Sequence, residues 1–261
     1  MDKAEFLTIY RTFERIDIVK QTLPGIVAET RRNDARLIVH DSTVNGRDQK
    51  WKYLQDLNKE NDFFLILSTN MAAAHVVNMC LQLGQSLYSP EYICLVEDDH
   101  GFVEGIIPEM IHAMKTYYGK ISPNGLRFGL FTGCGEHNTK RRDFLPEGHA
   151  FPAADNTPAQ FGRANACFRC APASHWNNVL KGFDPDEYLV SNYQVKILNQ
   201  RNYFNGFTSM IVKNGQFCNY IHSRGRGTSD EQELKRWDET YTASDARSKY
   251  KKEEGNSFPN E

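Results

Sequence analysis

The chain has 261 residues and a formal net charge of −2 at pH 7, from 31 basic and 33 acidic side chains. This length allows one α/β domain with a substantial buried core. The near-neutral charge gives no global attraction to nucleic acid, so we expect no nucleic-acid partner. Nowhere do about 18 apolar residues follow one another, which predicts the absence of a transmembrane segment and leaves peripheral membrane association open.

Cysteine usage and the N-terminus indicate the compartment. Six cysteines lie mostly within apolar stretches, as reduced core thiols do, rather than in the dense framework of a small secreted domain. Residues 1–12 lack the basic and apolar regions of a signal peptide. We therefore expect a cytoplasmic protein.

Short apolar runs alternate with segments of helical periodicity over the first hundred residues. The expected strands lie at 6–10, 37–40, 63–67 and 92–96, and the expected helices at 16–27, 51–57 and 71–87. Strands that alternate with helices in this way form a mainly parallel sheet with helices on its faces. The pattern predicts an α/β, Rossmann-like single domain.

The second half of the chain has a less regular pattern. Further strands are expected at 128–132, 161–170 and 217–221, and a helix at 188–200. Residues 230–261 are highly charged, with few large aliphatic side chains towards the end. Such a composition predicts a surface helix followed by a loose tail.

An acidic cluster follows the expected strand at 92–96 directly. It consists of Glu97, Asp98 and Asp99, with His100 next to them. Ligands of open α/β sheets bind at the carboxyl ends of the strands, and Mg²⁺ or Mn²⁺ prefers oxygen ligands such as carboxylates. Glu97 and Asp99 are therefore predicted metal ligands. The alternative is a solvated turn, although charge at the end of a buried strand is costly without a partner.

Four segments resemble sequence motifs of one enzyme family. Thr12-Phe13-Glu14-Arg15 follows the first strand, Asp41 ends the second, and Asn70 and Asn78 lie eight residues apart. Residues 91–100 read EYICLVEDDH. These segments resemble the "PTYNR" motif, the aspartate at the end of the second strand, and the "NxGxxxARN" and "EYI..LDxDD" motifs of the GT-A glycosyltransferases. The resemblance is to the large inverting family in particular, which includes many bacterial polysaccharide and surface-glycan transferases.

The resemblance extends over roughly residues 6–105 and implies a nucleotide-sugar donor, most readily a UDP-sugar. Glu97 takes the first acidic place of the DxD motif and Asp99 the second, so a bound Mn²⁺ or Mg²⁺ is implied. Ala72 and Val77 depart from the Gly and Arg of the third motif. The residues implied to contact the donor are Thr12, Phe13, Arg15, Asp41, Asn70 and Asp98.

Two later segments supply further candidates. The resemblance implies a late histidine as a further metal ligand, and His222 is the candidate. Arg224 and Arg226 are predicted to contact the diphosphate, because this Arg/Gly/Ser segment follows an expected strand; a basic surface loop is the alternative. In the resembling family a carboxylate base lies near the position of Asn192, which cannot accept the proton. Asp186 or Glu187 is therefore the candidate base, and both can equally be N-terminal capping acids.

Together these features predict a GT-A fold. Residues 1–105 form its nucleotide-sugar-binding half, 106–229 its acceptor-binding and catalytic half, and 230–261 the charged end. The predicted activity is metal-dependent transfer of a sugar to a hydroxyl of a glycan or lipid-linked acceptor, with inversion because the resembling family inverts. Two alternatives are a catalytically silent glycan- or nucleotide-binding module and a sugar-phosphate nucleotidyltransferase. The second is disfavoured because residues 10–15 contain no glycine.

Overall fold

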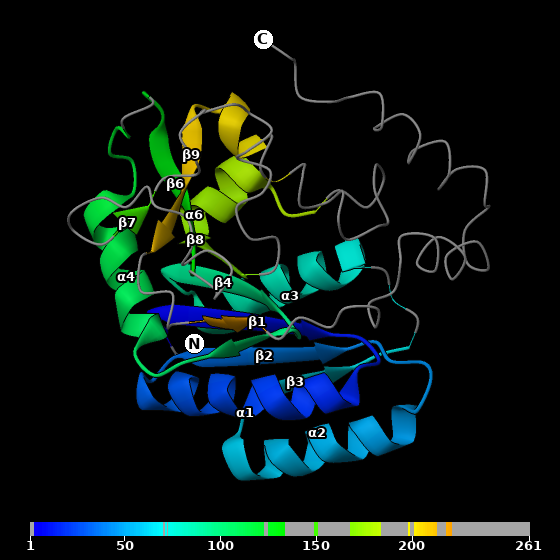
Figure 1. Ribbon diagram of the computed structural model, residues 1–261. Coiled ribbons are helices and arrows are strands. Elements are labelled where there is room, and N and C mark those ends of the chain that lie inside the picture. The colour runs from blue at the N-terminus through cyan, green and yellow to red at the C-terminus, as the bar shows by residue number, and fades with distance from the viewer. Residues whose placement is uncertain are drawn as a thin grey trace, which may run out of the picture.

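The computed structural model places a defined set of helices and strands (Figure 1). The residues that it describes are 3–69, 71, 73–122, 125–133, 149–150, 168–183, 198, 201–212 and 218–220. The strands are β1 (Phe6–Thr12), β2 (Arg36–Asp41), β3 (Phe64–Leu67), β4 (Tyr92–Glu97), β5 (His100–Phe102), β6 (Arg127–Thr132), β7 (His149–Ala150), β8 (Phe168–Pro172), β9 (Phe207–Val212) and β10 (Cys218–Tyr220). The helices are α1 (Ile16–Arg32), α2 (Arg47–Asn61), α3 (Ala73–Tyr88), α4 (Ile106–Tyr117), α6 (Ala173–His175) and the π-helical turn η1 (Trp176–Leu180).

The central sheet has eight strands in the order β3-β2-β1-β4-β8-β6-β9-β7. Neighbouring strands are parallel except where β8 meets β4 and β6 and where β7 meets β9. The predicted α/β fold with a mainly parallel sheet is thus confirmed. The chain runs outwards from β1 to β2 and β3 and then returns to β4 on the other side of β1, so strand order reverses between β1 and β4. Such a reversal opens a crevice at the carboxyl ends of the two strands.

Each face of the sheet packs against its own group of helices. Because successive strand residues point to opposite faces, Tyr10 of β1 packs in a cluster with α1, α2 and α4, whereas Leu7 and Ile9 pack in a cluster with α3 and η1. Figure 1 shows α1 and α2 beneath the blue strands. Helix α3 approaches β1 closely at Gly84, where a Cβ would clash with the Leu7 side chain. Two cores therefore hold the strand ends in place from both sides.

The elements expected before residue 100 all occur, with ends that differ by a few residues. Helix α2 is longer than its apolar pattern indicated, since its outer positions are polar and carry little periodic signal. Strand β5 was not predicted, because it is short and follows the acidic cluster directly. The expected segments 161–167 and 230–261 and most of 188–200 lie outside the described residues. Among the helices of the described part, none is long and apolar enough to cross a membrane.

Candidate functional site

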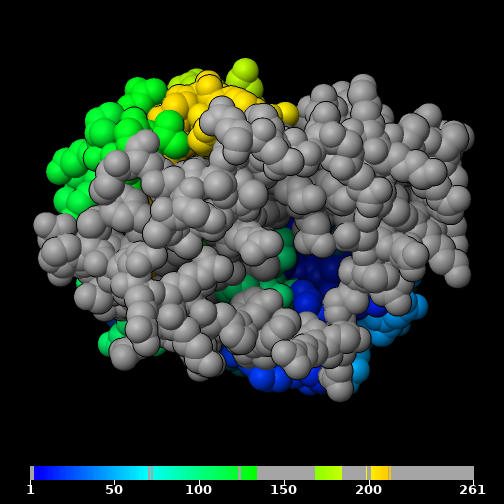
Figure 2. Space-filling model, turned by 45° about the horizontal axis from the view of Figure 1, so that its top comes forward, coloured from blue at the N-terminus to red at the C-terminus, as the bar shows by residue number. Residues whose placement is uncertain are grey.

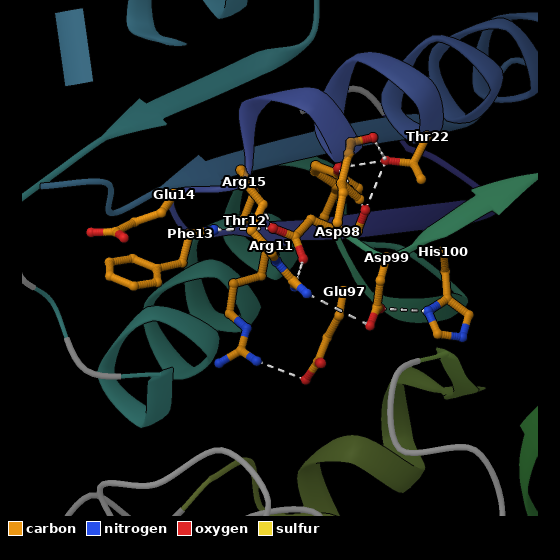
Figure 3. Close-up of polar contacts among 12 residues, drawn as sticks. Arg11, Thr12, Phe13, Glu14, Arg15, Thr22, Glu97, Asp98, Asp99 and His100 are labelled. Atoms are coloured by element: carbon orange, nitrogen blue, oxygen red, sulfur yellow. Dashed lines mark hydrogen bonds and ion pairs between the residues drawn. The ribbon is translucent and has the colours of Figure 1, made fainter. Parts of the chain in front are cut away.

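The carboxyl ends of β1, β2 and β4 bring the predicted motifs to one edge of the sheet. Arg11 lies opposite Glu97 in the β1–β4 ladder, and Thr12 lies opposite Asp41 in the β1–β2 ladder. Figure 3 shows the resulting group of acidic and basic side chains around the turn that follows β1. In Figure 2 the dark blue surface of N-terminal residues adjoins green surface from the region of β4 and β5.

The first acid, Glu97, belongs to the α3 side of the sheet. Leu95 packs in the cluster with α3, and Glu97 follows it two residues later on the same face. Glu97 Oε1 accepts a hydrogen bond of 2.7 Å from Arg11 Nη2. The two side chains are 20% and 14% exposed, so water still reaches the pair.

The second acid, Asp98, faces the opposite side and is 2% exposed. Its Oδ2 accepts hydrogen bonds from Thr12 Oγ1 at 2.9 Å and from the backbone nitrogen of Phe13 at 3.3 Å, and its Oδ1 accepts one from the Arg15 guanidinium. Burial raises the pKa of Asp98, while the charges of Arg15 and Lys50 oppose that rise. Asp98 therefore anchors the turn between β1 and α1.

The third acid, Asp99, lies between His100 and Arg15. Its Oδ1 is 2.8 Å from His100 Nδ1, and its Oδ2 is 3.9 Å from Arg15 Nη1. Burial by itself would raise the pKa of Asp99, but the hydrogen bond and charge of His100, together with Arg15, bring it below the usual value. Asp99 is 13% exposed, so an ionised carboxylate lies at the border between protein and water.

Asp41 is fully buried and lies in a hydrogen-bonded network on the α1 side. Its Oδ1 accepts from Lys50 Nζ at 2.6 Å and from Thr43 Oγ1 at 2.7 Å. Its Oδ2 accepts from Trp51 Nε1 at 2.8 Å and from the Thr43 backbone nitrogen at 3.2 Å. Each oxygen thus has two donors, which is about what a carboxylate oxygen accepts. The predicted nucleoside contact of Asp41 requires the exchange of one of these bonds and stays a prediction.

Lys50 and Arg11 are two site residues that the sequence reasoning missed. Lys50 Nζ donates to Asp41, to Thr12 Oγ1 at 2.8 Å and to Thr43 Oγ1 at 2.9 Å, which uses all three of its protons. Burial lowers the pKa of Lys50, and the charge of Asp41 opposes this. Nothing in the polar sequence of α2 marks Lys50 out. Arg11 does carry a signal, because it interrupts an apolar strand of the run FLTIYRT.

The predicted metal ligands Glu97 and Asp99 fit a hard cation in their chemistry, but two side chains do not complete its coordination. Glu97 and Asp99 offer partly exposed carboxylate oxygens, and Mg²⁺ typically takes one or two carboxylates together with substrate phosphates and water. In the part of the chain that the structure describes, no group of three or more His, Cys, Asp or Glu side chains is placed to hold a metal ion. The arrangement therefore suits a cation that is completed by a phosphate-bearing ligand.

Several predicted residues lie outside the described part of the chain and stay predictions. They are Asn70, Asp186, Glu187, His222, Arg224 and Arg226. The other asparagine of the spaced pair, Asn78, is described: it donates to the Phe183 carbonyl at 2.6 Å and accepts from the Phe183 backbone nitrogen at 2.8 Å. Asn78 thereby ties α3 to the segment after η1.

The fold is of the GT-A type, the α/β fold of nucleotide-sugar glycosyltransferases, and the structural neighbours of the chain are GT-A glycosyltransferases. Residues 1–349 of S. aureus TarS in complex with UDP superimpose with a TM-score of 0.61 at 9% identity, over 82% of this chain and 60% of that chain. The mannosyltransferase PcManGT from Pyrobaculum calidifontis, in complex with GDP-Man and Mn²⁺, gives 0.53 at 12% identity over 85% and 59%.

GalNAc-T7 with UDP, GalNAc and Mn²⁺ gives a TM-score of 0.58 at 10% identity, over 91% of this chain and 47% of that chain. This chain thus spans about half to three fifths of the length of these structures. No protein-family model and no curated protein sequence matches it. At such identities the likeness establishes the shared fold.

Proposed function

We propose that this protein is a metal-dependent glycosyltransferase that moves a sugar from a nucleoside diphosphate, most readily a UDP-sugar, to a hydroxyl of a glycan or lipid-linked acceptor. One observation carries the proposal: in a fold shared with nucleotide-sugar glycosyltransferases, the turn after β1 and the acidic cluster after β4 meet at the point where strand order reverses. Nucleotide ligands of open α/β sheets bind at such a point.

The described side chains have distinct roles in this proposal. Glu97 and Asp99 would hold Mg²⁺ or Mn²⁺, which when bound neutralises the charge that grows on the departing diphosphate. Thr12 and Phe13 would contact the nucleoside from the turn after β1, and Asp98 holds that turn by accepting hydrogen bonds from Thr12 Oγ1 and the Phe13 nitrogen. The guanidinium of Arg15 is suited to phosphate, because its planar fork binds phosphate oxygens in pairs.

Donor binding is the first test. A thermal-shift screen of nucleotide sugars with and without Mn²⁺ should show a rise in melting temperature for one donor, since a ligand that binds the folded state stabilises it in proportion to its affinity. Asp99→Ala should abolish the Mn²⁺-dependent part of the shift, measured against the melting temperature of the free variant. That temperature should itself fall somewhat, because buried His100 loses its hydrogen-bond partner. Wild-type transfer by this variant would exclude Asp99 as a metal ligand.

Proton transfer is the second test and concerns Asp186 and Glu187. Loss of a general base typically lowers the rate about 10²–10⁴-fold without an effect on donor binding, whereas loss of a capping residue costs about 1 kcal/mol of stability. Transfer rates and melting temperatures of Asp186→Asn and Glu187→Gln separate the two roles. Full activity in both variants would place the base elsewhere or favour a retaining mechanism.

A second candidate function is a nucleotide- or glycan-binding module without catalysis. Two observations favour it: Asn192 stands where the resembling family has its base, and the oxygens of Asp41 are already satisfied by internal donors. Donor binding without hydrolysis or transfer, across the acceptor classes named above, would support this reading.

A further inference from the structure

The acidic cluster carries its own counterions before any ligand arrives. Arg11 bonds Glu97, and Arg15 bonds Asp98 and lies 3.9 Å from Asp99. Three carboxylates and two guanidinium groups leave a formal local charge of −1, by the count −3 + 2. Figure 3 shows the Arg15 side chain reaching from the turn towards both Asp98 and Asp99. A divalent cation at Asp99 therefore meets a carboxylate that already has a cationic neighbour.

Arg15 differs from an ordinary surface arginine in its position between a buried and a partly exposed carboxylate. It is the N-cap residue of α1, directly after the turn at the end of β1, and its guanidinium lies at both Asp98 and Asp99. The side chain is 20% exposed, whereas Asp98 is 2% exposed. Asp98 keeps Thr12 Oγ1 and the Phe13 nitrogen as donors if the guanidinium turns away.

We propose that Arg15 is the resident counterion of Asp98 and Asp99 and competes with the divalent cation for Asp99. A nucleoside diphosphate brings two or more negative charges and paired oxygens that a guanidinium binds well. Its arrival moves Arg15 towards the diphosphate and removes the positive charge beside Oδ2 of Asp99, so that this oxygen can bind the cation while Oδ1 keeps its contact with His100. Metal binding is consequently weak without the nucleotide and tight with it, and the coupling is reciprocal. This inference rests on the function proposed above.

The direct measurement is Mn²⁺ affinity of the free protein, followed by electron paramagnetic resonance without any nucleotide. Arg15→Gln should bind Mn²⁺ at least about tenfold more tightly than the wild type, because removal of a neighbouring positive charge favours the cation. Arg15→Lys should stay close to the wild type, because the charge is kept. Arg31→Gln is the matched control, since Arg31 is an exposed arginine of the same helix, and it should leave the affinity unchanged.

The same titration with UDP present measures the coupling. UDP should tighten Mn²⁺ binding strongly in the wild type and only weakly in Arg15→Gln, because in the variant no counterion has to leave. If Arg15→Gln does not fold, the comparison can be made between the single variant Asp98→Asn and a double variant that carries Asp98→Asn together with Arg15→Gln. Neither contains an unpaired buried carboxylate. The double variant should bind Mn²⁺ more tightly than the single variant.

The outcomes separate this inference from the proposed function. Unchanged or weaker Mn²⁺ binding by Arg15→Gln without nucleotide overturns the role of Arg15, even if the wild type binds a nucleotide sugar and transfers it. Tighter Mn²⁺ binding by the variant, with no response of the wild type to any nucleotide, supports the counterion and contradicts the donor site. Absence of Mn²⁺ binding in every variant overturns the inference as well.

Discussion

Two acid–base pairs at the same edge of the sheet differ sharply in how they meet water. The buried pair, Asp41 and Lys50, is 0% exposed on both sides, and every donor and acceptor in it has a partner inside the protein. The rim pair, Glu97 and Arg11, is 20% and 14% exposed, with one bond of 2.7 Å between the two side chains. The pairs have equal formal charge.

The difference indicates separate roles. A buried pair whose hydrogen bonds are all made resists any exchange, because each broken bond leaves a polar group without water. A pair at the border with solvent can trade its partner for water, a cation or a phosphate at little cost. We therefore interpret the buried pair as the structural support of the β1–α1 turn and the rim pair as part of the surface on which a ligand binds.

The largest expected effect comes from breaking the buried pair. Lys50→Met removes the ammonium and leaves Asp41 charged and buried, which should lower the free energy of unfolding by about 3–5 kcal/mol. Urea denaturation measures the loss. Lys52→Met is the matched control two residues along α2: Lys52 pairs with Asp56 on the exposed surface, where solvent screens the charges, so the loss should be far smaller.

Adding Asp41→Asn to Lys50→Met sharpens this test. The amide is neutral, so the double variant should regain part of the stability lost in Lys50→Met. Equal losses for Lys50→Met and Lys52→Met would show that the buried pair contributes no more than an exposed one.

An intermediate effect is expected on acidification. Burial lowers the pKa of His40, which precedes Asp41 in β2, to about 4, against about 6.5 in the unfolded chain. As the pH falls, the unfolded state takes up the proton first. The contribution of neutral His40 to the free energy of unfolding is therefore complete above about pH 6.5 and is lost towards pH 4. The loss amounts to about 3 kcal/mol at most.

Burial also lowers the pKa of His175 to about 4. His40→Gln should therefore remove only part of the pH dependence of the free energy of unfolding. Unfolding free energies of the wild type and the variant, measured across this range, check the expectation. His112→Gln, at an exposed position of α4, is the control and should leave the dependence as it is. If the free energy of unfolding of His40→Gln fell with pH as steeply as that of the wild type, the expectation for His40 would be wrong.

The smallest expected effect concerns the rim pair. Arg11→Met should cost about 1 kcal/mol or less, because water can solvate the carboxylate of Glu97 when the guanidinium is gone. The same urea titration as for Lys50→Met gives the comparison directly. A loss of stability as large as that of Lys50→Met would contradict the distinction between a structural buried pair and an exchangeable rim pair.

The sequence by itself determined the fold class and the place of the acidic cluster. Apolar runs alternating with helical periodicity required a parallel sheet, and the run YICLV followed by Glu97 fixed the acids at a strand end. These features are local, because hydrophobic periodicity is encoded within ten or fifteen residues. The GT-A fold that the resemblance implied is the one that the structure has.

Only the tertiary structure decided which side chains meet. Arg11 and Glu97 are 86 residues apart in the chain, and their contact depends on β4 returning to the side of β1. The buried position of Lys50 depends on how α2 packs, which a polar helix sequence does not encode. Periodicity states which face of a strand a residue occupies, whereas the partner on that face follows from strand order. For this reason the counterions of the acidic cluster, and the internal bonds of Asp41, became visible only in the folded chain.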